Sequence, residues 1–122
     1  MDGRGFSFTD RIKAFGFAIT GLIKAVKTQH ALWFQLSAAA AIIVLGLYCN
    51  ITREDWRWLI LAITIVITAE TMNTAIEFLA DAVTKEHHEI IGHAKDVAAG
   101  AVLVAALGAA TIGIFTFWPY LI

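Results

Sequence analysis

The sequence predicts an all-α integral membrane protein, with an N-terminal amphipathic surface helix followed by three transmembrane helices. Composition supports this class, because 59% of the 122 residues are hydrophobic and only 16% are charged, and the mean hydropathy is +0.74. Three apolar runs, at residues 32–49, 58–80 and 97–118, are long enough to cross a bilayer. We therefore expect a single membrane domain over residues 1–122, without a separate soluble module.

The first helix is expected over residues 9–27, after a short polar terminus (residues 1–8) that we expect to be frayed. Its apolar residues recur at helical spacing, which is typical of a helix lying on a membrane surface: Ile12, Phe15, Ile19, Leu22, Ile23 and Val26. Packing against a soluble core is the alternative, but little soluble chain exists to supply that core. Basic residues bracket this segment without a clear cleavage site, so we expect it to be retained.

The three apolar runs are separated by two polar stretches. Residues 50–57 form a short charged connector, with Trp56 and Trp58 as interface aromatics, and residues 83–93 form a polar loop. The third run carries small residues at intervals of four, which allow close helix packing in lipid: Ala101, Ala105, Ala109 and Gly113. Three spans enclose little volume, so we expect a homo-oligomer whose interfaces complete the site.

Lysine and arginine residues are divided unevenly between the two sides of the predicted spans, which gives their orientation. Arg53 and Arg57 fall on the side of the first connector. The other basic residues fall on the opposite side: Arg4, Arg11, Lys13, Lys24, Lys27, Lys85 and Lys95. We therefore expect a multi-pass inner-membrane protein with its N-terminus and second loop in the cytoplasm and its C-terminus outside.

Charge and cysteine content exclude several classes of function. A net charge of −1 and an isoelectric point near 6.4 leave no basic surface for nucleic acid. The single cysteine, Cys49, cannot form an internal disulfide and has no nearby metal-type partner, so we interpret it as a small apolar filler.

The middle apolar run carries four polar residues on one side, here called the acidic face. At about 100° per residue, Glu70, Asn73, Glu77 and Asp81 fall within about 80° of one another. Charges are costly in hydrocarbon, so this face must meet protein, water or a bound cation. A hydrogen-bonded clasp between helices is the alternative interpretation, but a clasp needs one acid and this face has three.

The residue types on this face suit magnesium-dependent phosphoryl transfer. Mg²⁺ prefers oxygen ligands, often one or two carboxylates together with substrate phosphates, and a lysine neutralises phosphate charge. Polar residues cluster at the cytoplasmic end of the same run: Glu86, His88, Lys95 and Asp96. The glycine-rich phosphate loops GxxxxGK[ST] and GxGxxG are absent from the sequence, as are HExxH and GxSxG. A proton or cation pathway would use similar residues.

Longer motifs point to a family. E-T-M-N-T-A-I-E-F-L-A-D spans residues 70–81, H-E follows at 88–89, A-K-D-V-A-A-G-A-V-L spans 94–103, and F-A-x-T-G lies at 17–21. Together they resemble the prokaryotic diacylglycerol kinase and undecaprenol kinase family over nearly the whole chain. The resemblance implies a homotrimer of three-span subunits that uses ATP and Mg²⁺ to phosphorylate a membrane lipid alcohol.

The resemblance also implies roles by position. Glu70 matches the catalytic base and, with Ala99, a lipid-substrate contact, while Glu77 and Gln29 match metal ligands. The residues matching nucleotide contacts are Phe17, Gln29, Asn73, Glu77, Glu86, His87, His88, Lys95 and Asp96. Without the resemblance, Lys95 and Asp96 are explained as an interfacial anchor and a helix-start charge, and His87 and His88 as solvated loop residues.

Three positions depart from the diacylglycerol kinase pattern. Gln29 replaces a glutamate that shares the metal, so the metal would be held by a neutral oxygen there. Asp10 and Phe17 stand where that branch commonly has arginine and tyrosine. The forms A-A-G-A-V-L and F-A-x-T-G are more similar to the undecaprenol branch, which leaves diacylglycerol and undecaprenol both open as substrates.

Two other classes of function remain to be distinguished from a kinase. A small proton- or cation-conducting oligomer would use Glu70 and Glu77 as a relay, and would show ion flux without ATP. A non-catalytic membrane scaffold would need only the packing helices, but it leaves the acidic face unexplained.

Overall fold

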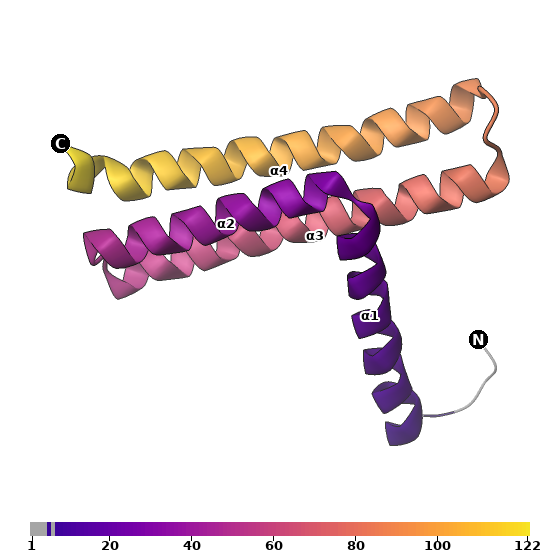
Figure 1. The fold of residues 1–122 in the computed structure, drawn as a ribbon, viewed down its shortest axis with the longest axis horizontal. Helices are drawn as coiled ribbons and strands as arrows, with labels where there is room; N and C mark the ends of the chain where they lie inside the picture. Colours follow the sequence, from indigo (N-terminus) through magenta and orange to yellow (C-terminus); the bar gives the residue numbers. More distant parts are fainter. Residues whose placement is uncertain (1–4, 6) are drawn as a thin grey trace.

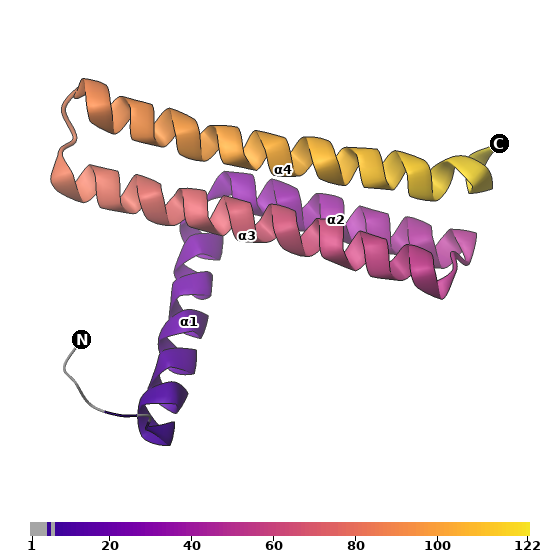
Figure 2. The same cartoon turned by 180° about the vertical axis from the view of Figure 1, so that it is seen from behind.

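Four helices make up the fold in this computed structural model, which describes residue 5 and residues 7–122. The helices are α1 (Phe8–Thr28), α2 (His30–Cys49), α3 (Arg53–Val83) and α4 (Glu89–Leu121). Helices α2, α3 and α4 run alongside one another as a bundle, and α1 projects from it (Figures 1 and 2). The fraying expected for residues 1–8 falls largely outside the described residues, and Phe8 already belongs to α1.

Helix α1 begins with a side-chain cap and ends at a sharp elbow. The hydroxyl oxygen of Ser7 accepts a hydrogen bond from the Asp10 backbone N–H at 3.3 Å, which satisfies one of the unpaired donors of the first turn. One extended residue, Gln29, separates α1 from α2, with φ −116° and ψ 111°. Near this elbow α1 contacts α2 and α3, and Ala25 and Leu32 are buried.

The connector between α2 and α3 is shorter than the sequence pattern predicts. Asn50, in the left-handed region at φ 52°, ends α2, and Thr52 caps α3 by accepting a hydrogen bond from the Asp55 N–H at 3.1 Å. The prediction of a connector over residues 50–57 is therefore wrong for residues 53–57, which are helical. A threonine cap followed by acids in the first turn favours this earlier helix start.

The loop between α3 and α4 is shorter as well. Val83 still belongs to α3, and α4 begins at Glu89 rather than near residue 97, so the polar loop expected over 83–93 is reduced to residues 84–88. The side chain of His88 caps α4, with Nδ1 accepting a hydrogen bond from the Ile91 N–H at 3.4 Å. The polar residues that follow His88 therefore occupy the first turns of a helix.

Three of the described helices, α2, α3 and α4, are long and apolar enough to cross a membrane. The 20 residues of α2 extend over about 30 Å, which equals the thickness of a hydrocarbon core. The 31 residues of α3 and the 33 residues of α4 extend over about 46 and 50 Å. At the α3–α4 connector these two helices reach beyond the end of α2 (Figure 1).

The opposite end of the bundle is fastened by apolar packing and one hydrogen bond. Ile51, Leu59 and Phe117 form a buried cluster, and Cys49 packs against it, which confirms its interpretation as an apolar filler. The hydroxyl of Tyr120 donates to Oδ2 of Asp55 at 2.7 Å and joins α4 to α3. Helices α3 and α4 are thus held together at the end opposite their connector.

Candidate functional site

The acidic face of α3 turns into the bundle. Glu70 and Asn73 are only 5% and 9% exposed, Glu77 is half-buried, and Asp81 is exposed. Burial therefore decreases along the face toward the α3–α4 connector. At Glu70 the face therefore points into the bundle and away from its surroundings. This direction is expected for acids within an apolar helix.

Side-chain hydrogen bonds around Glu70 leave one buried oxygen without a donor. Nδ2 of Asn73 donates to Oε1 of Glu77 at 3.3 Å. Oδ1 of the same amide is buried and has no hydrogen-bond partner among the described residues. The neighbouring Thr74 hydroxyl, by contrast, donates to the backbone oxygen of Glu70 at 3.0 Å. A buried acceptor without a partner is costly, and this one belongs to the amide whose Nδ2 contacts the carboxylate of Glu77.

The donor set on this face fits magnesium. Within the described chain no group of three or more His, Cys, Asp or Glu side chains lies close enough to hold a metal. Mg²⁺ does not need such a group, since it is often held by one or two carboxylates with substrate phosphates and waters. The Glu77 carboxylate and the unpartnered amide oxygen of Asn73 are both oxygen donors of the kind it prefers.

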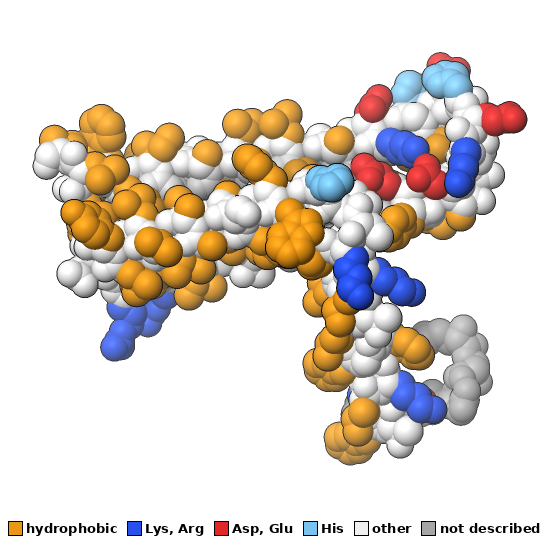
Figure 3. Space-filling model, viewed as in Figure 1, with side chains coloured by type: hydrophobic (Ala, Val, Ile, Leu, Met, Phe, Trp, Pro, Cys, Tyr) orange, Lys and Arg blue, Asp and Glu red, His pale blue; other side chains and the backbone are white. Residues whose placement is uncertain are grey.

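The polar end of the bundle gathers most of the predicted nucleotide contacts. Figure 3 shows acidic, basic and histidine side chains concentrated around the α3–α4 connector, while the visible side of the remaining bundle is largely apolar. Glu86 and His87 are exposed in the connector and His88 caps α4. Lys95 lies two turns into α4, where Nζ is 2.9 Å from Oδ1 of Asp81. Asp96 and Ala99, also on α4, are exposed.

Two predicted residues lie on α1 or at its end rather than on α3 or α4. Phe17 is on α1 and is 75% exposed, on the helix that projects from the bundle (Figure 1). Gln29 is half-buried at the elbow, and its side chain makes no capping hydrogen bond to α2. A single subunit therefore places Lys95 of α4 beside Asp81 of the acidic face, but carries Phe17 on the projecting helix α1.

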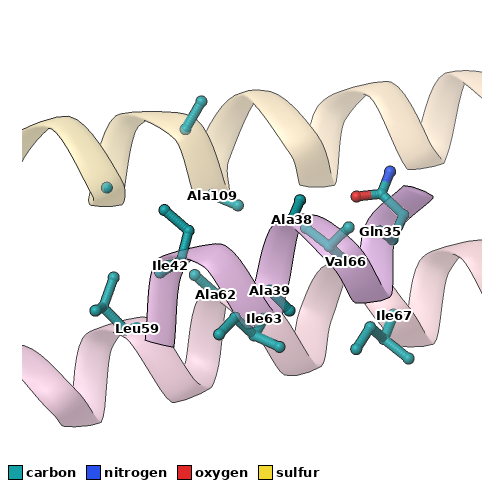
Figure 4. Close-up of a pocket in the computed structure, with 12 residues that line it drawn as sticks. Gln35, Ala38, Ala39, Ile42, Leu59, Ala62, Ile63, Val66, Ile67 and Ala109 are labelled. Atoms are coloured by element: carbon teal, nitrogen blue, oxygen red, sulfur yellow. The ribbon is translucent and has the colours of Figure 1, made fainter. Parts of the chain in front are cut away.

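An apolar cavity of about 180 Å³ lies among α2, α3 and α4. Figure 4 shows Ile42 of α2, Ala62 and Val66 of α3, and Ala109 of α4 along its walls. Ile67, the last α3 residue along its walls, precedes Glu70 by three residues, so the cavity ends about one helical turn before Glu70 on α3. The cavity was not predicted from the sequence, although small residues that line it were a visible signal: Ala38, Ala39, Ala62, Ala109 and Gly113.

Comparison with known proteins gives consistent matches over most of the chain. Residues 16–117 match the family model described as prokaryotic diacylglycerol kinase. An undecaprenol kinase of Bacillus subtilis is 35% identical over 109 residues, covering 89% of each chain. A diacylglycerol kinase of Escherichia coli K12 is 30% identical over 113 residues, covering 93% of each chain. A diacylglycerol kinase of Synechocystis is 33% identical over 101 residues, covering 82% of this chain and 58% of that protein.

Proposed function

The chain belongs to the prokaryotic diacylglycerol kinase family, and we propose that this lipid kinase transfers the γ-phosphoryl group of ATP to a membrane lipid alcohol with the help of Mg²⁺. The observation that carries the proposal is the burial of Glu70 on a face that opens toward the polar α3–α4 connector. A hydroxyl brought from the bilayer and a nucleotide brought from water can meet along this face.

We assign Glu70 as the general base. Its carboxylate takes the proton of the lipid hydroxyl while the hydroxyl oxygen bonds to the γ-phosphorus and the bond to the ADP oxygen breaks. The apolar cavity that ends near Glu70 supports this assignment, since it offers hydrocarbon surroundings beside a buried acid. Ala99 is the second proposed lipid contact. Most of the rate gain comes from positioning and charge neutralisation.

The remaining site residues bind the nucleotide and its metal. Glu77 and Gln29, with the amide oxygen of Asn73, would hold Mg²⁺, which neutralises phosphate charge when it is bound. Lys95 and Asp96 at the start of α4 contact the phosphates. Connector residues Glu86, His87 and His88 contact the rest of the nucleotide.

We further propose that the enzyme is a homotrimer in the inner membrane, with α1 on the cytoplasmic surface. Large apolar side chains exposed on α1 support this location, among them Phe8, Ile12, Phe15 and Phe17. Because Phe17 lies away from the polar end of its own subunit, its proposed nucleotide contact requires a neighbouring subunit. The excess of Lys and Arg supports a cytoplasmic N-terminus and α3–α4 connector, with the C-terminus outside.

The lipid substrates proposed are diacylglycerol and undecaprenol, and relatives with both names, which match nearly the full chain, support this choice. Thin-layer separation of products after the purified protein receives each alcohol with labelled ATP and Mg²⁺ distinguishes them. Ion flux in proteoliposomes without ATP, together with no phosphorylated product, would instead favour a conducting oligomer.

The assignment of Glu70 is tested with Glu70→Gln, which removes the base but keeps the shape. We expect loss of lipid phosphorylation, while assembly by size-exclusion chromatography and nucleotide binding stay unchanged. Glu54→Gln is the matched control, because Glu54 lies on the same helix at its opposite, exposed end. A near wild-type rate in Glu70→Gln would remove Glu70 as the base.

A further inference from the structure

Lys95 is held by an acid from another helix. Its Nζ lies 2.9 Å from Oδ1 of Asp81, so the contact joins α4 to the end of α3 across 14 residues of sequence. The Glu89–His93 pair at 3.8 Å lies within α4 alone. Asp81 thus links the acidic face directly to the lysine that we assign to the nucleotide phosphates.

The exposure of this pair argues against a purely structural role. The side chains of Lys95 and Asp81 keep 40% and 50% of their surface exposed to solvent. Exposed ion pairs contribute little to stability, because water screens them and two flexible side chains must be ordered. What such a contact does provide is a fixed place for the ammonium group, which otherwise sits on a flexible four-carbon chain.

We propose that Asp81 is a positioning residue, which holds the ammonium of Lys95 at the open end of the acidic face where the nucleotide phosphates arrive. An ammonium has three N–H donors, so the contact with Asp81 leaves others for phosphate oxygens. This inference rests on the proposed kinase function, and adds a residue with no assigned contact to substrate or metal.

An alternative role for Asp81 predicts the opposite change in nucleotide affinity. If Asp81 only competed with phosphate for Lys95, or only repelled phosphate through its charge, its neutralisation would strengthen nucleotide binding. If Asp81 positions Lys95, neutralisation weakens nucleotide binding although a repulsive charge has been removed. The direction of change in the KM for ATP therefore separates the two.

The test compares Asp81→Asn and Asp81→Glu with wild type, measuring kcat, the KM for ATP, the KM for the lipid, and MgATP binding without lipid. We expect Asp81→Asn to raise the KM for ATP and the Kd about three- to fivefold, the upper part of the range available to an exposed ion pair. The kcat and the KM for the lipid should stay near wild type. Asp81→Glu, which keeps the charge, should recover most of the affinity.

The same substitution made in a Lys95→Ala protein isolates the contact between Asp81 and Lys95. In Lys95→Ala, Asp81→Asn should bring no further loss of MgATP affinity, because the partner to be positioned is gone. Glu89→Gln is the matched control: it removes an acid at the same end whose carboxylate lies near His93, and it should leave the KM for ATP unchanged.

Several outcomes would overturn the inference: an unchanged or lower KM for ATP in Asp81→Asn, an equal loss in the Lys95→Ala background, or failure of Asp81→Asn to assemble, which would make Asp81 structural. An inactive wild-type protein would count against the proposed function itself, so the two failures are distinguishable.

Discussion

Replacing Asn73 by leucine tests whether its buried oxygen is kept open for a ligand. In the single subunit, Oδ1 of Asn73 has no described partner, while Nδ2 donates to Glu77. An unpartnered buried acceptor costs about 1–3 kcal/mol, and a hydrogen bond to a charged group contributes about 1.5–3 kcal/mol. Leucine is similar in shape to asparagine and removes both the unpartnered acceptor and the hydrogen bond to Glu77. The stability gained from the first change and lost from the second therefore nearly cancel. We expect the free energy of unfolding to change by no more than about 1 kcal/mol.

Activity should respond very differently from stability. If Oδ1 of Asn73 is a contact for the magnesium nucleotide, its loss should lower the phosphorylation rate about a hundredfold or more, as when one preorganised polar contact is removed. Unfolding in mixed detergent and SDS micelles, followed by tryptophan fluorescence, measures stability. Initial rates with saturating ATP, Mg²⁺ and lipid measure activity.

Thr74→Val is the matched control for Asn73→Leu. Thr74 is 2% exposed, and its hydroxyl is already satisfied by the backbone oxygen of Glu70 within α3. This variant should therefore keep most of the wild-type rate. An active Asn73→Leu protein that has lost more than about 2 kcal/mol of stability would show that Asn73 is an ordinary structural amide and refute the reasoning.

Three further predictions concern the elbow, the first connector and the far end of the bundle. Gln29→Glu should lower the Mg²⁺ concentration needed for half-maximal rate, and an unchanged Mg²⁺ titration would remove its metal role. Gly46→Ala places a Cβ 2.7 Å from Cη2 of Trp56, and the resulting overpacking costs about 1–3 kcal/mol against a helix-propensity gain of about 1 kcal/mol. Unfolding experiments should therefore show a lower stability. Gly92→Ala, where a Cβ meets nothing within 4 Å, is the control. Tyr120→Phe removes the 2.7 Å hydrogen bond to Asp55 and should slightly lower the unfolding midpoint in SDS without changing the phosphorylation rate. A changed rate would contradict the separation of this end of the bundle from the site.

The helices could be predicted because their signals are local. Three apolar runs of sufficient length identify α2, α3 and α4, and the structure confirms three long apolar helices. Their ends were less predictable, because single caps decide them. Thr52 starts α3 inside the expected connector, and His88 starts α4 inside the expected loop.

The inward direction of the acidic face was also predictable, since acids in an apolar helix are too costly to leave in hydrocarbon. Contacts between helices could not be predicted in this way. The partner of Lys95 depends on how α3 and α4 meet at their connector, and helical spacing on α3 alone does not supply it. The unpartnered oxygen of Asn73 depends on which way its amide turns toward Glu77.

The one-residue elbow at Gln29 links two parts of the molecule mechanically. Helix α1 ends at Thr28 and α2 begins at His30, so the direction of α1 relative to the bundle is set mainly by the two backbone dihedrals of Gln29. Any change in the direction of α1 relative to the bundle must therefore rotate the backbone that carries the Gln29 side chain. If that side chain is a metal ligand and α1 lies on the membrane surface, as proposed above, bilayer thickness and curvature become variables that tune the occupancy of the metal, through a hinge made of one amino acid.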